Sequence, residues 1–135
     1  DGFAYSERSY DRAGRLIEER FLDVGRTLVR PGRAKSVHTY DRFGNTLETR
    51  FFDADGEPAL ADVSGRAVVK FVYDERTRLI EEVSLDAAEE PVDRRDKGWH
   101  RRSTSYAPGG AKAAEMCFKV SGAETPCEPA PASTP

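Results

Sequence analysis

Apolar and polar residues alternate along most of the chain, in short segments separated by glycine, proline and aspartate. In the segment 66–73, Ala67, Val69 and Phe71 fall on one face and Lys70 falls on the other. A period of two, together with many β-branched and aromatic residues, is typical of half-buried strands. The pattern therefore predicts a chain built from β-strands.

One segment, 15–22, has apolar residues at helical spacing as well. It is short and is bracketed by Gly14 and Gly25, and its counterpart 46–52 is rich in threonine and phenylalanine. Because repeated segments should share one structure, we interpret both as strands.

The alternating pattern recurs in four units that align on a tyrosine. These tyrosines are Tyr10, Tyr40, Tyr73 and Tyr106, at intervals of 30, 33 and 33 residues. A glycine precedes each tyrosine by eight residues, at Gly2, Gly32, Gly65 and Gly98. The units span approximately 2–31, 32–64, 65–97 and 98–123. A period in this range indicates a repeat array.

Each unit contains two predicted turns. After the tyrosine, Asp41 bonds its own downstream backbone, and Gly44 supplies the positive φ that closes a type I turn with a bulge. Thr77 replaces this glycine in the third unit, where we expect mild strain. The return strand ends in a second turn, Asp53–Gly56, and a connection that carries Pro58 leads to the next unit.

The predicted fold is therefore all-β: four tandem β-hairpins over residues 1–123 form one curved antiparallel sheet of about eight strands. We expect this sheet to curl so that one face is buried. The sequence does not decide whether the sheet also closes partly into a barrel-like form. The fourth unit has lost the aspartate after Tyr106 and is interpreted as a capping unit. Residues 124–135 are rich in proline, alanine, serine and threonine, which indicates a tail or linker.

Charge and composition narrow the possible functions. The chain has 21 basic and 24 acidic residues and a net charge of −3, which argues against nucleic-acid binding. No apolar run reaches membrane-spanning length. The chain begins at Asp1 with no signal peptide, so we interpret it as a processed or excised piece of a larger protein.

Two cysteines, Cys117 and Cys127, lie ten residues apart near the C-terminal end. A disulfide between them suits an extracytoplasmic protein, whether secreted, periplasmic or on the cell surface. Two free thiols are the alternative.

Candidate chemical sites are few. The acidic pair Asp53 and Asp55 resembles the start of a calcium loop, but the equivalent turns lack it, so we interpret it as turn chemistry. His38 and His100 have no further ligands at zinc spacing. The recurrent glutamates are interpreted as the solvated face of the sheet. No catalytic residue, metal or cofactor is predicted, and a glutamate-based hydrolase stays as a residual alternative.

Three residues that depart from the repeat, together with the tyrosine of the fourth unit, are the candidate binding residues. Phe43 lies at the tip of a turn, where an aromatic side chain gains little from packing and suggests contact with a partner. Trp99 and His100 replace other residue types in the fourth unit, and Tyr106 follows them. We therefore take Phe43, Trp99, His100 and Tyr106 as tentative binding residues.

A known repeat family carries the same motif. Tyr-Asp-x-x-Gly, followed by a strand and an Asp-x-x-Gly turn, occurs at 10–16, at 40–46 and, less completely, at 73–74. Over most of residues 2–120 the chain resembles the YD repeats of the RHS family, although its units and the connection 57–64 are longer and the family's protease motif has no match. This resemblance implies an all-β array in a bacterial secreted or cell-surface protein with an encapsulating, carbohydrate-contacting or adhesive role. The hairpin repeats of cell-wall-binding modules are a second, weaker resemblance.

These features favour a non-enzymatic structural or interaction module that binds a protein partner through its surface or an exposed sheet edge. Self-association through such edges is expected as well. The alternative is a carbohydrate- or small-ligand-binding domain that uses exposed aromatic residues.

Overall fold

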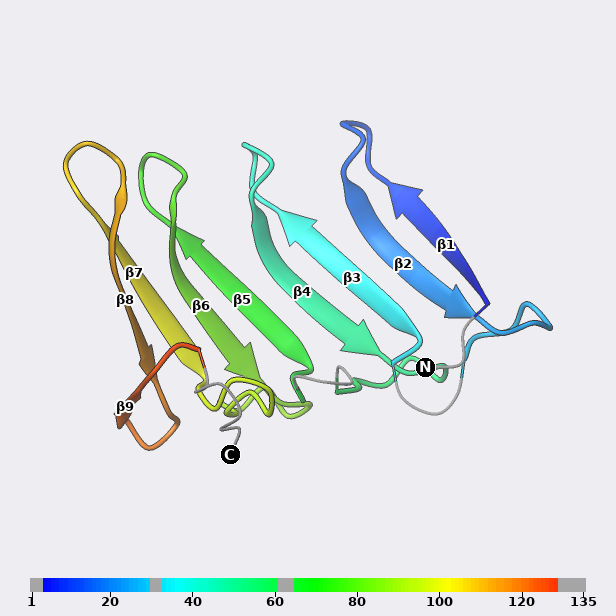
Figure 1. Cartoon of the computed structure of the whole chain (residues 1–135). Coiled ribbons are helices and arrows are strands. Elements are labelled where there is room, and N and C mark those ends of the chain that lie inside the picture. Colours follow the sequence, from blue (N-terminus) through cyan, green and yellow to red (C-terminus); the bar gives the residue numbers. More distant parts are fainter. Residues whose placement is uncertain (1–3, 30–32, 61–64, 129–135) are drawn as a thin grey trace, which may run out of the picture.

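The computed structural model describes residues 4–29, 33–60 and 65–128. This part of the chain forms a single antiparallel sheet of nine strands, paired in chain order (Figure 1). The strands are β1 (Tyr5–Tyr10), β2 (Leu16–Leu22), β3 (Lys35–Tyr40), β4 (Thr46–Phe52), β5 (Val68–Tyr73), β6 (Leu79–Leu85), β7 (Arg101–Tyr106), β8 (Lys112–Phe118) and β9 (Glu124–Thr125). The described residues contain no helix, and the predicted all-β class is confirmed.

Four hairpins of one register build the sheet. We number them 1 to 4, as β1–β2, β3–β4, β5–β6 and β7–β8. Their terminal pairs are Tyr5 with Leu22, Lys35 with Phe52, Val68 with Leu85 and Arg101 with Phe118. In each hairpin the register shifts at the tyrosine that defines the unit. The segment 16–22, with its helix-like spacing, is a strand, as its repeat context predicts.

The two turns of each of the four units, eight in all, share one hydrogen-bond pattern. The N–H of the first turn residue donates to the carbonyl four residues later, and its own carbonyl accepts from the N–H three residues later. Each fourth residue has a positive φ: Gly14, Arg26, Gly44, Gly56, Thr77, Glu89, Gly110 and Gly122. Five of them are glycine, which takes this conformation freely. The strained position expected at Thr77 is present, with φ at 62°.

Neighbouring hairpins are held by short pairings and by a tyrosine contact. β2 pairs with β3, β4 with β5, and β6 with β7, over three residues each. The tyrosine hydroxyl of each later hairpin donates to a backbone carbonyl of the hairpin before it. These hydrogen bonds are Tyr40 to Leu16 (2.5 Å), Tyr73 to Thr46 (2.8 Å) and Tyr106 to Leu79 (2.7 Å).

β9 corresponds to a single β-bridge that follows the second turn in each of the other three hairpins. After each second turn the chain bridges back to the end of the return strand, at Leu22–Leu28, Phe52–Pro58 and Leu85–Pro91. In the fourth unit this bridge, Phe118–Glu124, extends to Cys117–Thr125 and becomes a strand. The segment that composition indicates as a tail thus begins with residues that belong to the sheet. Its remainder from 129, like Gly2 and Gly32, lies outside the described residues.

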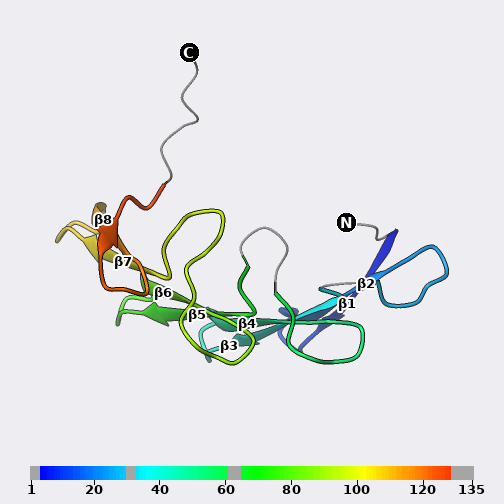
Figure 2. The same cartoon turned by 90° about the horizontal axis from the view of Figure 1, so that it is seen from below.

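The sheet is open and one layer thick (Figure 2). β1 and β9 stand at opposite ends of the strand order and do not pair, so the barrel-like form left open by the sequence is not adopted. The reason lies in the size of the core. Buried apolar residues gather in two small clusters near the second turns: Phe21, Val29 and Ala34 in one, and Ala67, Val68 and Leu85 in the other. Neither cluster extends over a whole face, so closing the sheet would bury little additional apolar area.

Candidate functional site

A groove that contains the exposed aromatic residue Phe43 lies between the tips of hairpins 2 and 3. It has a volume of about 430 Å³. We call it the tip groove, and its main lining residues are Asp41, Phe43, Leu47, Val72, Tyr73 and Asp74. The Phe43 side chain is 68% exposed, as its position in a turn predicts. Leu47 and Val72 are exposed as well, which gives the groove an apolar wall.

The turns around it fix the geometry of the tip groove. The Asp41 carboxylate accepts hydrogen bonds from the backbone N–H groups of Phe43 and Asn45, both at 2.9 Å. These bonds hold the turn that carries Phe43 outward. The Tyr73 hydroxyl donates to the Thr46 carbonyl at 2.8 Å and fixes the ring, which lines the groove, against hairpin 2. The groove is therefore built from backbone-anchored residues of two hairpins.

The charged side chains that line the tip groove are acidic, and one of them, Asp74, is paired with Arg78 at 2.8 Å. Asp41, Asp74 and Glu75 line the groove, and none of its lining residues is basic. Desolvation raises the pKa of Asp41, but hydrogen bonds from Asn45 and its neighbours outweigh this effect and keep the pKa below its usual value. The pKa of Tyr73 is raised by desolvation and then by the negative charge of Asp41. Carboxylates beside an aromatic ring suit a cation.

The other candidate residues lie outside the tip groove. The hydroxyl of Tyr106 is committed to the Leu79 carbonyl, and the Arg78 guanidinium is stacked over its ring at 4.6 Å. Tyr106 therefore joins hairpins 3 and 4. His100 lies just before β7, and its backbone N–H donates to the Phe118 carbonyl. The Nδ1 atom of its imidazole ring is buried without a hydrogen-bond partner.

Trp99 is completely buried, so its indole is not available to a ligand. Its Nε1 donates to the Cys127 carbonyl at 2.8 Å. Cys127 forms a disulfide with Cys117, with a Cα–Cα distance of 5.1 Å, and the described residues hold no free cysteine. The exposed binding role expected for Trp99 is thus replaced by a core role, because the fourth unit packs its indole under the cysteine staple.

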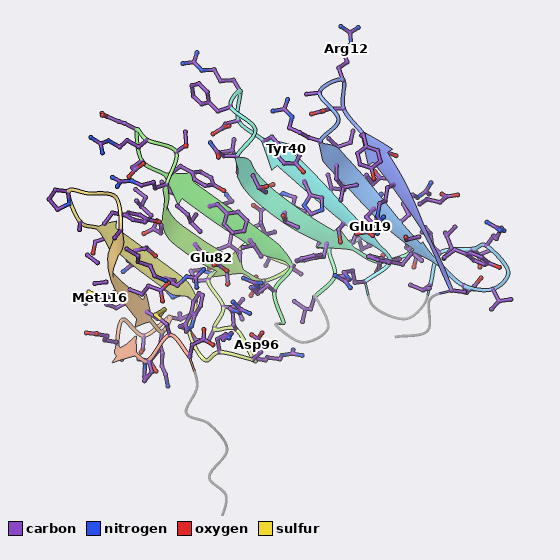
Figure 3. The ribbon with its side chains drawn as sticks, turned by 45° about the horizontal axis from the view of Figure 1, so that its top comes forward. Arg12, Glu19, Tyr40, Glu82, Asp96 and Met116 are labelled. Atoms are coloured by element: carbon purple, nitrogen blue, oxygen red, sulfur yellow. A yellow bond between two sulfur atoms is a disulfide. The ribbon has the colours of Figure 1, made fainter. Side chains whose placement is uncertain are left out.

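Glu82 corrects the expectation that the glutamates form a solvated face. It is only 6% exposed, and its carboxylate accepts from the guanidinium groups of Arg66 and Arg102, both at 2.7 Å. Arg94 lies 3.7 Å away and pairs in turn with Asp96. Glu82 and Asp96 are labelled in Figure 3. Burial lowers the pKa of Arg66, and the charge of Arg94 lowers it further. The cluster is internally paired and forms part of the core. The alternation of polar and apolar residues gave no signal for it.

The two sheet edges are the remaining exposed elements. β1 has exposed side chains along its whole length and, among the described residues, no partner on the side away from β2. Tyr5 and Tyr10 are 40% and 55% exposed. On the opposite edge, β8 pairs with β9 through Cys117 and Phe118 alone. Figure 3 shows Met116 on this edge, and its side chain is exposed.

The described residues form neither a metal-binding cluster nor a membrane-spanning helix. Within 4–29, 33–60 and 65–128, no group of three or more histidine, cysteine, aspartate or glutamate side chains is placed to hold a metal ion. In these same ranges, no helix is long and apolar enough to cross a bilayer.

No known protein family and no curated protein matches the chain.

Proposed function

We propose that this chain is a non-enzymatic interaction module, to which a protein partner adds a strand along β1. In the described part of the chain, the observation that carries the proposal is the unpaired edge of β1, which corresponds to the edge that β3, β5 and β7 each pair with a preceding hairpin. β3, β5 and β7 each receive the return strand of the preceding hairpin over three residues. β1 has the same repeat pattern and no such neighbour among the described residues.

Tyr10 supports the proposal at the level of one atom. The hydroxyls of Tyr40, Tyr73 and Tyr106 each donate to a carbonyl of the adjacent hairpin. Tyr10 occupies the same position in β1 and is 55% exposed. A strand added along β1 supplies the missing carbonyl as well as main-chain hydrogen bonds, the source of affinity in this mode of binding.

A second copy of the chain is a partner of the right chemistry. Lys112 stands where Leu16, Thr46 and Leu79 stand in the other hairpins, so its carbonyl is the fourth acceptor of the series. With the register of the internal interfaces, Met116 lies opposite Tyr5, and both side chains are exposed. A methionine sulfur beside an aromatic ring is a favourable contact.

The disulfide and the repeat motif support an extracytoplasmic location and a family relationship, respectively. The disulfide between Cys117 and Cys127 supports an extracytoplasmic site of action, secreted, periplasmic or at the cell surface, because such bonds persist in oxidising compartments. The repeated hairpins with Tyr-Asp turns support kinship with the YD repeats of the RHS family. Adhesive or encapsulating roles fit a module that joins proteins edge to edge.

The test is edge association at rising protein concentration, followed by sedimentation velocity and crosslinking. Wild type should form head-to-tail species with crosslinks between β1 and β8. Tyr5→Lys combined with Tyr10→Ala should weaken association at least about tenfold, because it removes an apolar contact and a hydrogen bond. Phe43→Ala is the matched control, an exposed aromatic far from both edges, and should associate like wild type. A chain that stays monomeric at millimolar concentration contradicts edge addition.

The tip groove favours a second candidate function, the binding of a carbohydrate or small ligand. Phe43 is exposed beside a groove with apolar and carboxylate walls, and aromatic faces with nearby acceptors are features of such sites. A glycan array with wild type and Phe43→Ala tests it, and an array without signal rejects it.

A further inference from the structure

Three equivalent positions follow the first turns of hairpins 1, 2 and 3, and two of them are arginine. Arg15, Asn45 and Arg78 each stand five residues after the tyrosine of their unit. Each lies at the junction with the next hairpin, beside the next unit's tyrosine. A comparison of the three junctions shows what an arginine does there and what is missing at Asn45.

At the first junction, Arg15 joins two hairpins through its guanidinium. Its Nε donates to the Asp11 carboxylate at 2.9 Å, and one of its terminal nitrogens donates to the Asp41 carbonyl at 3.2 Å. The guanidinium carbon lies 5.5 Å from the centre of the Tyr40 ring. One cation thus binds a carboxylate, a carbonyl and an aromatic face at once.

The third junction repeats this arrangement. The Nε of Arg78 donates to the Asp74 carboxylate at 2.8 Å. Its guanidinium carbon lies 4.6 Å from the centre of the Tyr106 ring. In both junctions the arginine covers the tyrosine and neutralises the aspartate of the turn.

The second junction has the same acceptors, but asparagine stands at the position of the arginine. The Asn45 side chain donates to the Asp41 carboxylate at 3.1 Å but is too short to reach over Tyr73. Among the described residues, no cationic side chain is stacked on the Tyr73 ring, whereas Arg42 is stacked on Phe43 nearby. The tip groove, about 430 Å³, occupies this place. It is the space that an arginine fills at the other two junctions.

We propose that the tip groove binds an arginine side chain from a protein partner. The guanidinium takes the place of the absent internal arginine: over the Tyr73 ring, beside the Asp41 carboxylate and toward the Asp74 carbonyl. Exposed Phe43, Leu47 and Val72 pack against the aliphatic part of that side chain and the adjacent partner residues. This site is separate from β1 and does not depend on strand addition there.

The geometry selects arginine over lysine. Both internal examples use Nε for the carboxylate and a planar group for the ring, and Arg15 adds a terminal nitrogen for the carbonyl. Lysine supplies a point charge without the planar fork, so it satisfies fewer of these contacts at one time.

The experiment uses the ¹⁵N-labelled chain and four probes followed by chemical-shift titration. The probes are N-acetyl-arginine methylamide, the matching lysine and citrulline compounds, and free arginine. The blocked arginine should give saturable shifts at Phe43, Tyr73 and Asp74. Citrulline keeps the shape and loses the charge, and should bind about tenfold more weakly or not at all.

Two variants test the assignment to the missing arginine. Asn45→Arg should fill the groove from within and abolish the shifts around Tyr73, while the rest of the spectrum keeps its pattern. Arg15→Asn should open the equivalent space over Tyr40 and give a second set of shifts there. Tyr10→Ala, which changes only the β1 edge, should bind the probe like wild type.

Several results overturn the proposal. Equal binding of the lysine and arginine probes contradicts a guanidinium site. Tighter binding of free arginine than of blocked arginine assigns the groove to a small amino acid in place of a partner's side chain. Unchanged shifts in Asn45→Arg, or no new shifts near Tyr40 in Arg15→Asn, show that the vacancy is not the origin of binding.

Discussion

At the scale of single residues, the repeat makes exceptions easy to interpret, since each position has siblings for comparison. Thr77 is the clearest case. Its equivalents Gly14, Gly44 and Gly110 adopt positive φ without a side chain, whereas Thr77 has φ at 62° with a branched one. A β-branched residue in this region is a genuine outlier. The turn forms because Asp74 and the two strands around it impose the geometry.

Thr77→Gly should therefore stabilise the protein. Release of the left-handed strain outweighs the added freedom of the unfolded chain, and we expect a gain of about 0.5–1 kcal/mol. Urea unfolding followed by tryptophan fluorescence measures it. The reverse change, Gly14→Thr, is the matched control, because a Cβ there meets no atom within 4 Å and the expected cost comes from the backbone conformation. A destabilised Thr77→Gly chain contradicts the strain argument.

Residues with local roles could be predicted from the sequence, and residues whose roles depend on neighbouring hairpins could not. Tyr10, Asp41 and Gly44 were predictable because their roles are local: a turn, a strand end, a positive φ. Trp99 and Glu82 were not, since their burial depends on which side chains the neighbouring hairpins bring over them. The tip groove was predictable only in part. Phe43 is exposed as expected, but the vacancy at Asn45 becomes visible only beside Arg15 and Arg78.

At the scale of elements, the turns are stabilised by aspartates. Hydrogen bonds from the backbone of Arg15, Thr27 and Arg78 are the largest cause that lowers the pKa of Asp11, Asp23 and Asp74 respectively. A carboxylate whose pKa is lowered by folding adds stability above its unfolded pKa and loses that contribution as pH falls through the folded value. The turns should thus be sensitive to acid.

We expect the urea midpoint of wild type to fall as pH drops below about 4, near the ordinary aspartate pKa. Asp74→Asn should flatten this decline, since the amide keeps an acceptor for the turn and does not titrate. Glu75→Gln, an exposed carboxylate next to Asp74, should leave the decline unchanged. Equal acid profiles for wild type and Asp74→Asn would show that the turn aspartates do not set acid stability.

At the scale of the whole molecule, the sheet is a linear array in which hairpins contact neighbours only. β9 and the Cys117–Cys127 disulfide belong to the last hairpin, with Trp99 packed below them. In such arrays stability is close to a sum of unit and interface contributions, so a local change acts locally. The disulfide lies in the fourth hairpin, so this hairpin depends most on the bond.

Cys127→Ser should therefore destabilise the fourth hairpin by about 2–3 kcal/mol, the scale for a disulfide that closes a short loop. Amide hydrogen exchange measures the effect strand by strand. Protection should fall in β7 and β8 and stay near wild type in β3 and β4. The double variant Cys117→Ser with Cys127→Ser separates loss of the bond from effects of a remaining thiol. A uniform loss of protection would show one cooperative unit.

The spacing of the units has a consequence for variation in this protein. Tyr10 and Tyr40 are 30 residues apart, while the later tyrosines are 33 apart, yet every hairpin keeps the same register. The three additional residues fall between the second turn and the next strand, where they shift no strand pair. The length of the connection between two hairpins therefore does not affect the pairing of the strands. We expect residues inserted at these connections to form longer loops, while the hairpins keep their strand register.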